Sequence, residues 1–523
     1  MFVYSEEYWH TRSTGASRND RIHPSTSEIN SALTNVQSNS GSSASEGLRS
    51  YIGRMNYSAY DKYLLEFSFR VDGSSKFIKG HQYGFFPTVA VGWRFTEEEF
   101  LKKYLSSWLS SGKLRASWGK LGDNSGVGRF EQLETLTAMN YMSSDVVKGF
   151  VNKKMINKDL SWEVSTDINV GLDLGFLNNR LRTEIDFYNR LRTGMNRPSQ
   201  MSIHLTGAYS APRANIGDLL NRGLELNLTW KDKIGNVEYS VNLNGAYNRT
   251  VLKEWNEFLS RGWVYLDMPY HFLYVYENNG IAQTWQDIYN NTPQGLSPGD
   301  VIRKDLNGDG IIDGKDKKAY PNIQRDRPTT TYGITLQAAW KGFDISMLFN
   351  GGLGRKDFWL TDFNNTAFAD RRYASTWDHW TEPWSLENRG GEWPRLGTST
   401  DRSDNSYWLY NMNYLRMKNI MLGYNLPKKL LSKISMTNLR IYASAENLFT
   451  VTQYPGLDPE KKNSARDLYP INRSFSIGLN VSFLNRKELN VEHHISELIV
   501  LNEKLAVLCR MLRIYPIRFL WRI

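Results

Sequence analysis

The sequence feature that most constrains the fold is an alternation of apolar and polar residues with a period of two. It is clearest between residues 161 and 195, where every second residue from Val164 to Leu174 is apolar or threonine. A short Asn178-Asn179 segment follows, and the alternation then resumes from Leu181 to Phe187. Successive side chains of a β-strand point to opposite faces. The segment therefore predicts an antiparallel hairpin with one apolar face.

The same pattern recurs in series along the chain. Further hairpins are predicted at 222–247, 329–354 and 48–75, with turns within 231–236, at Lys341-Gly342 and near Asp61-Lys62. The last predicted strand contains Phe475, Ile477, Leu479, Val481 and Phe483. We count about thirteen candidate strands by this criterion. An all-β chain built from consecutive hairpins is the expectation.

The connections between these strands alternate between short and long. Turns within hairpins take a few residues, whereas the connections 123–160, 253–328 and 355–410 are far longer. Transmembrane β-barrels have this asymmetry, with tight periplasmic turns and long extracellular loops. Strands of about ten residues with one apolar face also fit a tilted bilayer crossing. We therefore expect a transmembrane antiparallel β-barrel, although alternation alone does not separate a lipid-facing surface from a protein core.

Composition excludes several other classes of protein. No run approaches about 18 apolar residues, which excludes a bundle of membrane-spanning helices. The aromatic content of 13% is too high for a disordered chain. The net charge of +10 arises from 64 basic and 54 acidic residues mixed along the chain, so no nucleic-acid partner is indicated. A single cysteine, Cys509, rules out an internal disulfide.

The segment Asp305–Asp316 has the spacing of a calcium-binding loop. Oxygen-bearing side chains fall at loop positions 1, 3, 5, 9 and 12, Gly310 occupies the sixth position, and the seventh offers a backbone carbonyl. The predicted ligands are Asp305, Asn307, Asp309, Ile311, Asp313 and Asp316. Aspartate at the twelfth position favours a weaker site than glutamate would. The alternative is a polar Asp/Asn/Gly turn that binds no metal. No organic cofactor is indicated.

The long connections are rich in tryptophan. Exposed aromatic rings can stack on sugar rings while neighbouring polar groups bond the hydroxyls. The candidate substrate-binding residues are Trp263, Trp285, Trp377, Trp380, Trp384 and Trp393. The alternative is that these rings pack within large folded loops.

Two common catalytic motifs are absent from the sequence. It contains no phosphate-binding Gly-x-x-x-x-Gly-Lys and no His-Glu-x-x-His, and its Gly-x-Ser-x-Gly match at Gly295–Gly299 falls in the long connection 253–328. The adjacent His493 and His494 have no companion ligand at metal-binding spacing. We therefore expect a protein that is not an enzyme. A glycan-cleaving enzyme with a carboxylate pair on the polar strand faces is kept as an alternative.

Several stretches resemble one family. They are Tyr63–Phe77, Gly84–Phe95, Leu114–Asp123, Tyr332–Ser346, Tyr414–Pro427, Asn438–Glu460 and Ser474–Phe483. In sequence and in order they are similar to SusC/RagA-type TonB-linked outer membrane proteins. The resemblance extends over residues 48–483. It implies a subunit of a nutrient importer in the cell outer membrane of a Gram-negative bacterium.

The resemblance also implies partners and cargo. A SusD-like lipoprotein would close over the barrel, the TonB complex would supply energy, and the substrate would be an oligosaccharide or an oligopeptide, with glycans favoured. Barrels of this transporter size have roughly 22 strands. With about thirteen visible, and with no signal peptide, plug or TonB box, residues 48–483 are expected to be the C-terminal part of an incomplete barrel. Residues 1–47, rich in Ser, Thr, Asn and Gly, are expected to be a loop-like remnant.

The pattern changes after Phe483. Leu498, Leu501, Leu505 and Leu508 have helical spacing, so residues 484–523 predict an atypical helical tail. Two explanations stay open: an artefact of reading frame or stop codon, and a membrane-surface or partner helix. The alternative to the importer as a whole is a calcium-stiffened, β-rich cell-surface binding module.

Overall fold

The computed structural model describes most of residues 1–483. Its description leaves out most of 20–36 and 202–210, together with 106–107, 143–145, 153, 258–264, 271, 359–381, 396–404, 432–435 and 462–470. Residues 484–523, including the predicted helical tail, lie outside the described part. No helix within the described part is long and apolar enough to cross a membrane.

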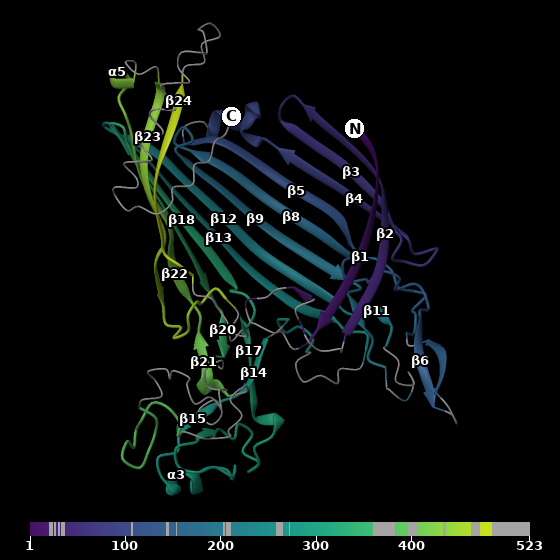
Figure 1. Ribbon diagram of the computed structural model, residues 1–523. Coiled ribbons are helices and arrows are strands. Elements are labelled where there is room, and N and C mark those ends of the chain that lie inside the picture. The colour runs from purple at the N-terminus through teal and green to yellow at the C-terminus, as the bar shows by residue number, and fades with distance from the viewer. Residues whose placement is uncertain are drawn as a thin grey trace.

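A single antiparallel sheet of fourteen strands forms the body of the molecule. Its strands lie side by side in chain order, so each hairpin pairs with the next, and Figure 1 shows them as one curved wall. They are β1 (Phe2–Arg18), β2 (Gln37–Ala59), β3 (Tyr63–Ser74), β4 (Tyr83–Trp93), β5 (Leu109–Asp123), β8 (Glu163–Phe176), β9 (Leu181–Thr193), β12 (Asp218–Ile234), β13 (Val237–Glu254), β18 (Thr330–Trp340), β19 (Phe343–Leu353), β22 (Tyr414–Asn425), β23 (Met436–Thr452) and β24 (Ser474–Phe483). The expected all-β architecture of serial hairpins is confirmed. Within the described residues β1 and β24 are the two edges, and the wall is not closed.

The expectation that residues 1–47 are loop-like is wrong for residues 2–18 and 37–47, which form strands. Strand β1 pairs with β2 over 17 residues, from Phe2 opposite Gly53 to Arg18 opposite Gln37. Polar cross-strand contacts support the ladder, including Ser17 Oγ with Ser38 Oγ at 2.7 Å. Backbone hydrogen bonds form a strand pair whatever the side chains are. Residues 11–18 and 37–45 of this hairpin are mostly small and polar, so this part of it has the composition of a loop.

Tight turns join the strands at one end of the wall. Lys341 and Gly342 both have positive φ, 46° and 91°, and Asn178 and Asn179 have φ of 58° and 60°. Such left-handed turns match the twist of paired strands. Both predicted turns are confirmed. The turn predicted within 231–236 is shorter than expected, because β12 continues to Ile234 and only two residues precede β13.

The wall has one apolar and one polar face. Across β5, β8, β9 and β12 the register aligns Leu114, Leu172, Ile185 and Leu226 on one face. At the adjacent position of each strand, the register aligns Arg115, Gly171, Asp186 and Glu225 on the other face. Arg115 bonds both Asp173 and Asp186 there, at 2.7 and 2.9 Å. An apolar face that continues across these four strands and is exposed fits contact with lipid rather than with water.

Long connections gather at the end of the wall opposite the tight turns, as Figure 1 shows. They contain the small hairpins β6 (Leu136–Met142) with β7 (Val146–Asn152), β10 (Asn196–Pro198) with β11 (Arg213–Asn215), β14 (Phe272–Tyr276) with β17 (Lys317–Gln324), β15 (Asn278–Ile281) with β16 (Val301–Arg303), and β20 (Lys356–Phe358) with β21 (Leu409–Asn411). The short helices α3 (Trp285–Tyr289), η3 (Gly314–Asp316) and η5 (Ser406–Trp408) belong to this end as well. Three more, η2 (Phe95–Glu97), α1 (Glu99–Leu105) and α5 (Lys428–Leu431), lie in connections at the turn end.

Three of the long connections pack together around one apolar core. The core residues are Leu273, Val275, Val301, Phe358, Trp408, Met412 and Tyr454, which come from residues 255–329, 354–413 and 453–473. We call the described residues of these three connections the loop cap. The loop cap and the single wide sheet do not match the two packed sheets of a soluble sandwich, which was one form of the alternative binding module.

Candidate functional site

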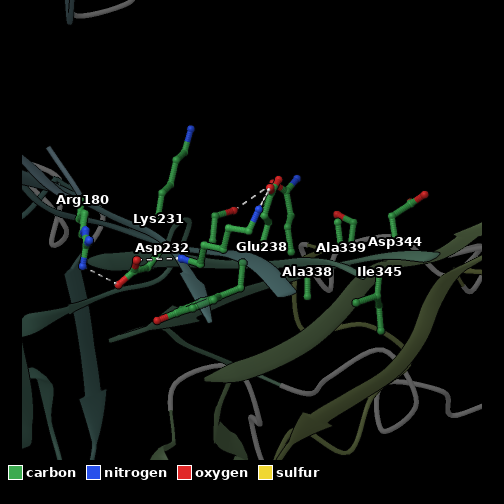
Figure 2. Close-up of a pocket in the computed structure, with 13 residues that line it drawn as sticks. Arg180, Lys231, Asp232, Glu238, Ala338, Ala339, Asp344 and Ile345 are labelled. Carbon is green, nitrogen blue, oxygen red and sulfur yellow. Dashed lines mark hydrogen bonds and ion pairs between the residues drawn. The ribbon is translucent and has the colours of Figure 1, made fainter. Parts of the chain in front are cut away.

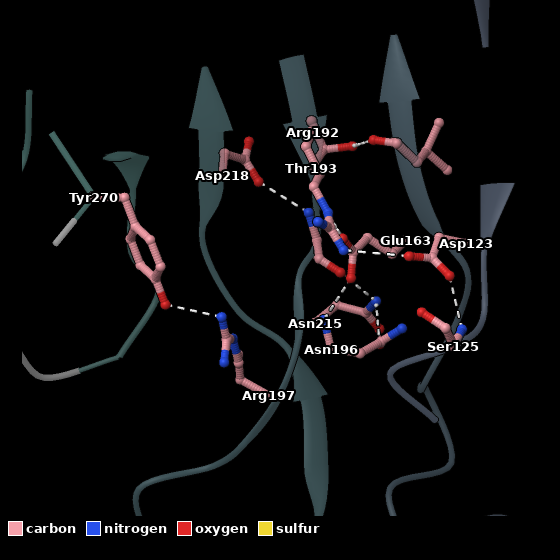
Figure 3. Close-up of polar contacts among 12 residues, drawn as sticks. Asp123, Ser125, Glu163, Arg192, Thr193, Asn196, Arg197, Asn215, Asp218 and Tyr270 are labelled. Atoms are coloured by element: carbon pink, nitrogen blue, oxygen red, sulfur yellow. Dashed lines mark hydrogen bonds and ion pairs between the residues drawn. The ribbon is translucent and has the colours of Figure 1, made fainter. Parts of the chain in front are cut away.

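A polar junction forms where β5, β8, β9 and β12 meet the long connections, and Figure 3 shows its side chains. Glu163, only 4% exposed, is ion-paired with Arg192 from the neighbouring strand. Arg192 also contacts Asp123 Oδ2 at 3.3 Å, and Glu163 accepts a hydrogen bond from the backbone N–H of Asn196 at 3.2 Å. These bonds satisfy a charge that would otherwise be costly to bury.

Asn215 fastens the β10–β11 hairpin to this junction. Its Nδ2 donates to the Gly194 carbonyl at 2.9 Å and to Asn196 Oδ1 at 3.0 Å, and its Oδ1 accepts from the Ser161 N–H at 3.0 Å. The backbone of Gly194, which has a φ of 65°, donates to Asp218 Oδ1 at 3.0 Å. The hairpin is therefore held rigidly at the strand ends, which is a requirement for a preorganised binding site.

A cavity of about 570 Å³ opens beside the junction. We call it the mouth cavity. Its lining residues are Ser125, Gly126, Glu163, Arg192, Met195, Asn196, Arg197, Arg213, Leu219, Thr250, Tyr270, Gln324, Asp326 and Arg327. Arg197 donates to the Tyr270 hydroxyl at 2.8 Å, as Figure 3 shows. The size is that of a small-molecule site. Sequence reasoning missed this cavity because its residues come from seven separate segments of the chain.

The predicted calcium loop is described in full and is folded by its own side chains. Asp305 accepts hydrogen bonds from the N–H groups of Gly308 and Gly310, at 2.6 and 2.9 Å. Asp316 is fully buried and accepts from the N–H groups of Asp313 and Leu306, at 2.8 and 2.9 Å. Those backbone bonds, Asp313's first, lower the pKa of Asp316 against the opposing effect of burial.

The donor set of this loop suits a hard cation, because carboxylate, amide and carbonyl oxygens are the ligands of Ca²⁺. Within the described part of the chain, however, no group of three or more His, Cys, Asp or Glu side chains is placed to hold a metal ion. Calcium binding by the loop therefore stays a prediction.

Residues 4–448 match the family described as TonB dependent receptor-like, beta-barrel. The chain belongs to the TonB-dependent receptor β-barrel family. Such receptors are β-barrels of the Gram-negative outer membrane, which locates this chain there. The family consists of receptors and transporters rather than enzymes.

Curated relatives support the assignment to TonB-dependent receptors. Over 476 residues the chain is 30% identical to TonB-dependent receptor P3 of Formosa agariphila, with 83% of this chain and 45% of that protein covered. It is also 30% identical over 456 residues to TonB-dependent receptor SusC of Bacteroides thetaiotaomicron, covering 83% of this chain and 44% of that protein. The chain thus spans about half the length of the curated relatives it matches.

Solved structures support the receptor-barrel fold. The structure of the RagAB peptide transporter superposes with a TM-score of 0.74, covering 92% of this chain and 53% of that chain at 23% identity. The resemblance to the SusC/RagA type is therefore confirmed, as is the receptor-barrel fold. In a receptor barrel the tight-turn end is periplasmic, the long connections are extracellular, and the polar strand face lines the lumen. The mouth cavity accordingly lies at the extracellular end of the lumen.

The six predicted substrate-binding tryptophans have different surroundings in the receptor barrel. Trp384 is only 7% exposed and donates from Nε1 to Gln283 Oε1 at 2.9 Å, so it is not the exposed platform that sugar stacking needs. Trp393 packs against the core of the loop cap. Trp285, at 56% exposed, keeps its ring accessible on α3. Trp263, Trp377 and Trp380 lie outside the described residues.

A buried ion-pair network anchors the loop cap to the barrel wall. Arg416 of β22 bonds Asp458 at 2.8 Å and Glu460 at 3.0 Å, and both Arg416 and Asp458 are buried. Within the loop cap, Arg355 donates to the carbonyls of Pro459 and Glu460, at 3.0 and 3.2 Å, and so joins two of its connections. Sequence reasoning did not single out these residues. The signal was available, because Asp458 and Glu460 end the Asn438–Glu460 stretch that carries the family resemblance.

A second cavity, of about 680 Å³, lies at the periplasmic turns and is drawn in Figure 2. Two ion pairs join lining residues to one another: Arg180 with Asp232 at 3.3 Å and Lys233 with Glu238 at 3.1 Å. Asp344 also lines the cavity and pairs with Arg440, which lies outside the lining. The basic residues Arg180, Lys231 and Lys233 are matched in number by the acidic residues of the lining, so the lining has no net charge to offer a ligand.

Proposed function

We propose that this chain forms part of an outer-membrane importer that takes up an oligomeric nutrient with a SusD-like lipoprotein and energy from TonB. The observation that carries the proposal is a polar cavity at the extracellular mouth of a wall that belongs to the TonB-dependent receptor barrels. Similarity to SusC supports the lipoprotein partner and a glycan substrate, and the likeness to the RagAB peptide transporter keeps an oligopeptide as the other substrate class.

The mechanism requires no chemistry at the substrate. Polar side chains at the mouth would bind the oligomer by many weak contacts, and the loop cap would present its outer surface to the lipoprotein. Arg416 of β22 anchors the loop cap, and Arg355 joins two of its connections. Both support this role, because a docking surface must keep its shape. Passage would follow displacement of a plug by the TonB complex, along the polar lumen face.

Deleting the gene in its own host tests the proposal. The mutant and the parent would be grown on single carbon or nitrogen sources: neutral oligosaccharides, acidic oligosaccharides and oligopeptides. We expect loss of growth on one class of oligomer and unchanged growth on its monomer, which crosses the outer membrane through porins. Affinity purification of the tagged protein should recover a lipoprotein. Unchanged growth on every oligomer would overturn the proposal.

We also propose that the loop Asp305–Asp316 binds Ca²⁺ and so stiffens the loop cap. The ligands would be the side chains of Asp305, Asn307, Asp309, Asp313 and Asp316 with the Ile311 carbonyl. Gly308 and Gly310 support this proposal, because both have positive φ and open space around Cα, which lets the loop tighten around an ion.

A further inference from the structure

The residues that line the mouth cavity carry a net positive charge. Four arginines and two carboxylates line it. Glu163 forms an ion pair with Arg192, and Arg192 also pairs with Asp123. Asp326 is the second carboxylate of the lining, which also contains Arg197, Arg213 and Arg327.

None of these three guanidinium groups is ion-paired with a carboxylate of the described residues. Arg213 donates to the neutral carbonyl of Asn196 at 3.1 Å, and Arg197 donates to the Tyr270 hydroxyl at 2.8 Å. Arg327 is exposed on the connection leading into β18. Each guanidinium carries five N–H donors in a fork that matches a carboxylate. Most of that donor capacity is still available at this cavity.

A second and independent observation comes from Asn196. It is only 5% exposed, and its Nδ2 is buried without a hydrogen-bond partner among the residues described. Its Oδ1, by contrast, is satisfied by Asn215. A buried donor without an acceptor is rare and calls for an explanation. An acceptor oxygen arriving in the cavity that Asn196 lines would supply one.

We propose that the mouth cavity binds carboxylate groups of the imported oligomer, so that the cargo is an acidic oligosaccharide containing uronate or an acidic oligopeptide. The inference rests on the proposed import function and names its substrate class. Arg197, Arg213 and Arg327 recognise the carboxylates, Asn196 Nδ2 donates to a further oxygen, and the Tyr270 ring lies beside Arg197 at 5.9 Å from its guanidinium carbon. Neutral oligomers offer acceptors but no charge to offset three cations.

Binding measurements with matched probes test this proposal. The purified full chain in detergent is titrated with trigalacturonate and with the same trisaccharide as its neutral methyl ester. A second pair, triglutamate and triglutamine, tests the peptide source in the same way. We expect at least one acidic probe to bind roughly tenfold or more tightly than its neutral partner, and added NaCl to weaken that binding. Tighter binding of the acidic member of the saccharide pair would identify an oligosaccharide as the source of the carboxylate. Tighter binding of the acidic member of the peptide pair would identify an oligopeptide.

Three variants localise the effect to the mouth cavity. Arg197→Gln and Arg327→Gln should each weaken the acidic probe by roughly tenfold, because each removes a charge-assisted contact. Asn196→Asp keeps the acceptor that Asn215 uses but replaces the free donor with negative charge, and it should weaken the acidic probe as well. Arg180→Gln is the matched control, because it removes the same charge at the periplasmic end.

Several results would overturn the inference. Equal binding of acidic and neutral probes, no binding of either acidic probe, or an equal effect of Arg180→Gln would each do so. Unheated gel electrophoresis would show how much of each arginine variant folds. If less of a variant folds but its folded fraction binds the acidic probe as the parent does, these arginines stabilise the packing instead of binding the cargo. The import proposal would survive all of these results, because a growth defect on neutral oligomers would support it without an acidic cargo.

Discussion

At the scale of single residues, the strongest stability prediction concerns Arg416. Replacing it with methionine leaves Asp458 buried without its counter-charge. Breaking one side of such a pair costs about 3–5 kcal/mol, and urea unfolding of the refolded protein would measure the loss. Lys233→Met is the matched control, because its pair with Glu238 is exposed and is worth at most about 1 kcal/mol. Equal losses of unfolding free energy in the two variants would mean that burial does not make the Arg416 pair more stabilising than the exposed Lys233 pair.

A second residue-scale prediction concerns pH and Glu98, in the periplasmic connection after β4. Glu98 accepts from the Tyr63 hydroxyl at 2.6 Å, then from Trp93 Nε1 at 3.2 Å and from Lys62. These bonds, Tyr63's first, lower the pKa of Glu98. A lowered folded-state pKa stabilises the fold above the unfolded value of about 4.3, and that stabilisation is lost as the pH falls through the folded-state pKa.

Thermal unfolding between neutral and acidic pH would test this dependence. The Glu98→Gln variant should unfold at a lower temperature at neutral pH and lose less stability on acidification than the parent does. Its neighbour Glu97 pairs with Lys102 on the exposed surface, so Glu97→Gln should leave the pH profile unchanged. A parallel profile for Glu98→Gln and the parent would contradict the assignment.

At the scale of elements, the sequence predicted best what is local. Period-two alternation and left-handed turn residues specify a hairpin within about thirty residues, and strands such as β8 and β9 were predicted for that reason. Strand β1 was missed because its residues 11–18 are mostly small and polar and lack an apolar face. The loop cap was missed because its pairs, such as Trp384 with Gln283 and Arg416 with Asp458, join residues from distant segments of the chain. No periodicity encodes such contacts, and the mouth cavity was unpredictable for the same reason.

Two turn glycines allow a matched test of how turns set the hairpins. Gly342 has a φ of 91°, and a Cβ there would lie 2.9 Å from the Asn425 carbonyl oxygen. Gly235 has a φ of 59° with nothing within 4 Å. Gly342→Ala should therefore destabilise the barrel by more than about 1 kcal/mol, and Gly235→Ala by less than Gly342→Ala. Unfolding midpoints in urea would measure both, and the reverse order would refute the steric argument.

The calcium proposal belongs to this scale because it concerns one loop. Titration calorimetry with millimolar Ca²⁺ should show heat for the parent that Asp305→Ala and Asp309→Ala both remove. Asp267→Ala serves as the control: Asp267 lies in the same long connection, where it pairs with Lys253. Heat that persists in both loop variants would place the ion elsewhere, and no heat in the parent would make the loop a polar turn held by its own hydrogen bonds.

At the scale of the whole molecule, the wall combines two opposite requirements. Its apolar face must meet lipid, and its polar face must bind water and cargo. The edges β1 and β24 carry unpaired backbone groups within the described residues, which a bilayer does not tolerate. The wall therefore needs strand partners at both edges before it can reside in lipid. The period-two pattern predicted one apolar and one polar face, because successive side chains of a strand point to opposite faces of the sheet.

Neighbouring residues in the middle of β12 provide the decisive test of which face meets lipid. Leu226 lies on the apolar face, and Asn227 lies on the polar face, where it borders a cavity with Glu184 and Glu225. Leu226→Arg should cost about 2–4 kcal/mol, the penalty for a cation at the bilayer midplane. Asn227→Arg should be tolerated, because two carboxylates border its site. Unfolding in lipid vesicles of a complete barrel that contains this chain would measure both variants. If Asn227→Arg lowered the free energy of unfolding more than Leu226→Arg did, the lipid-facing and lumen-facing sides would be the reverse of those assigned. The mouth cavity would then not lie in the lumen.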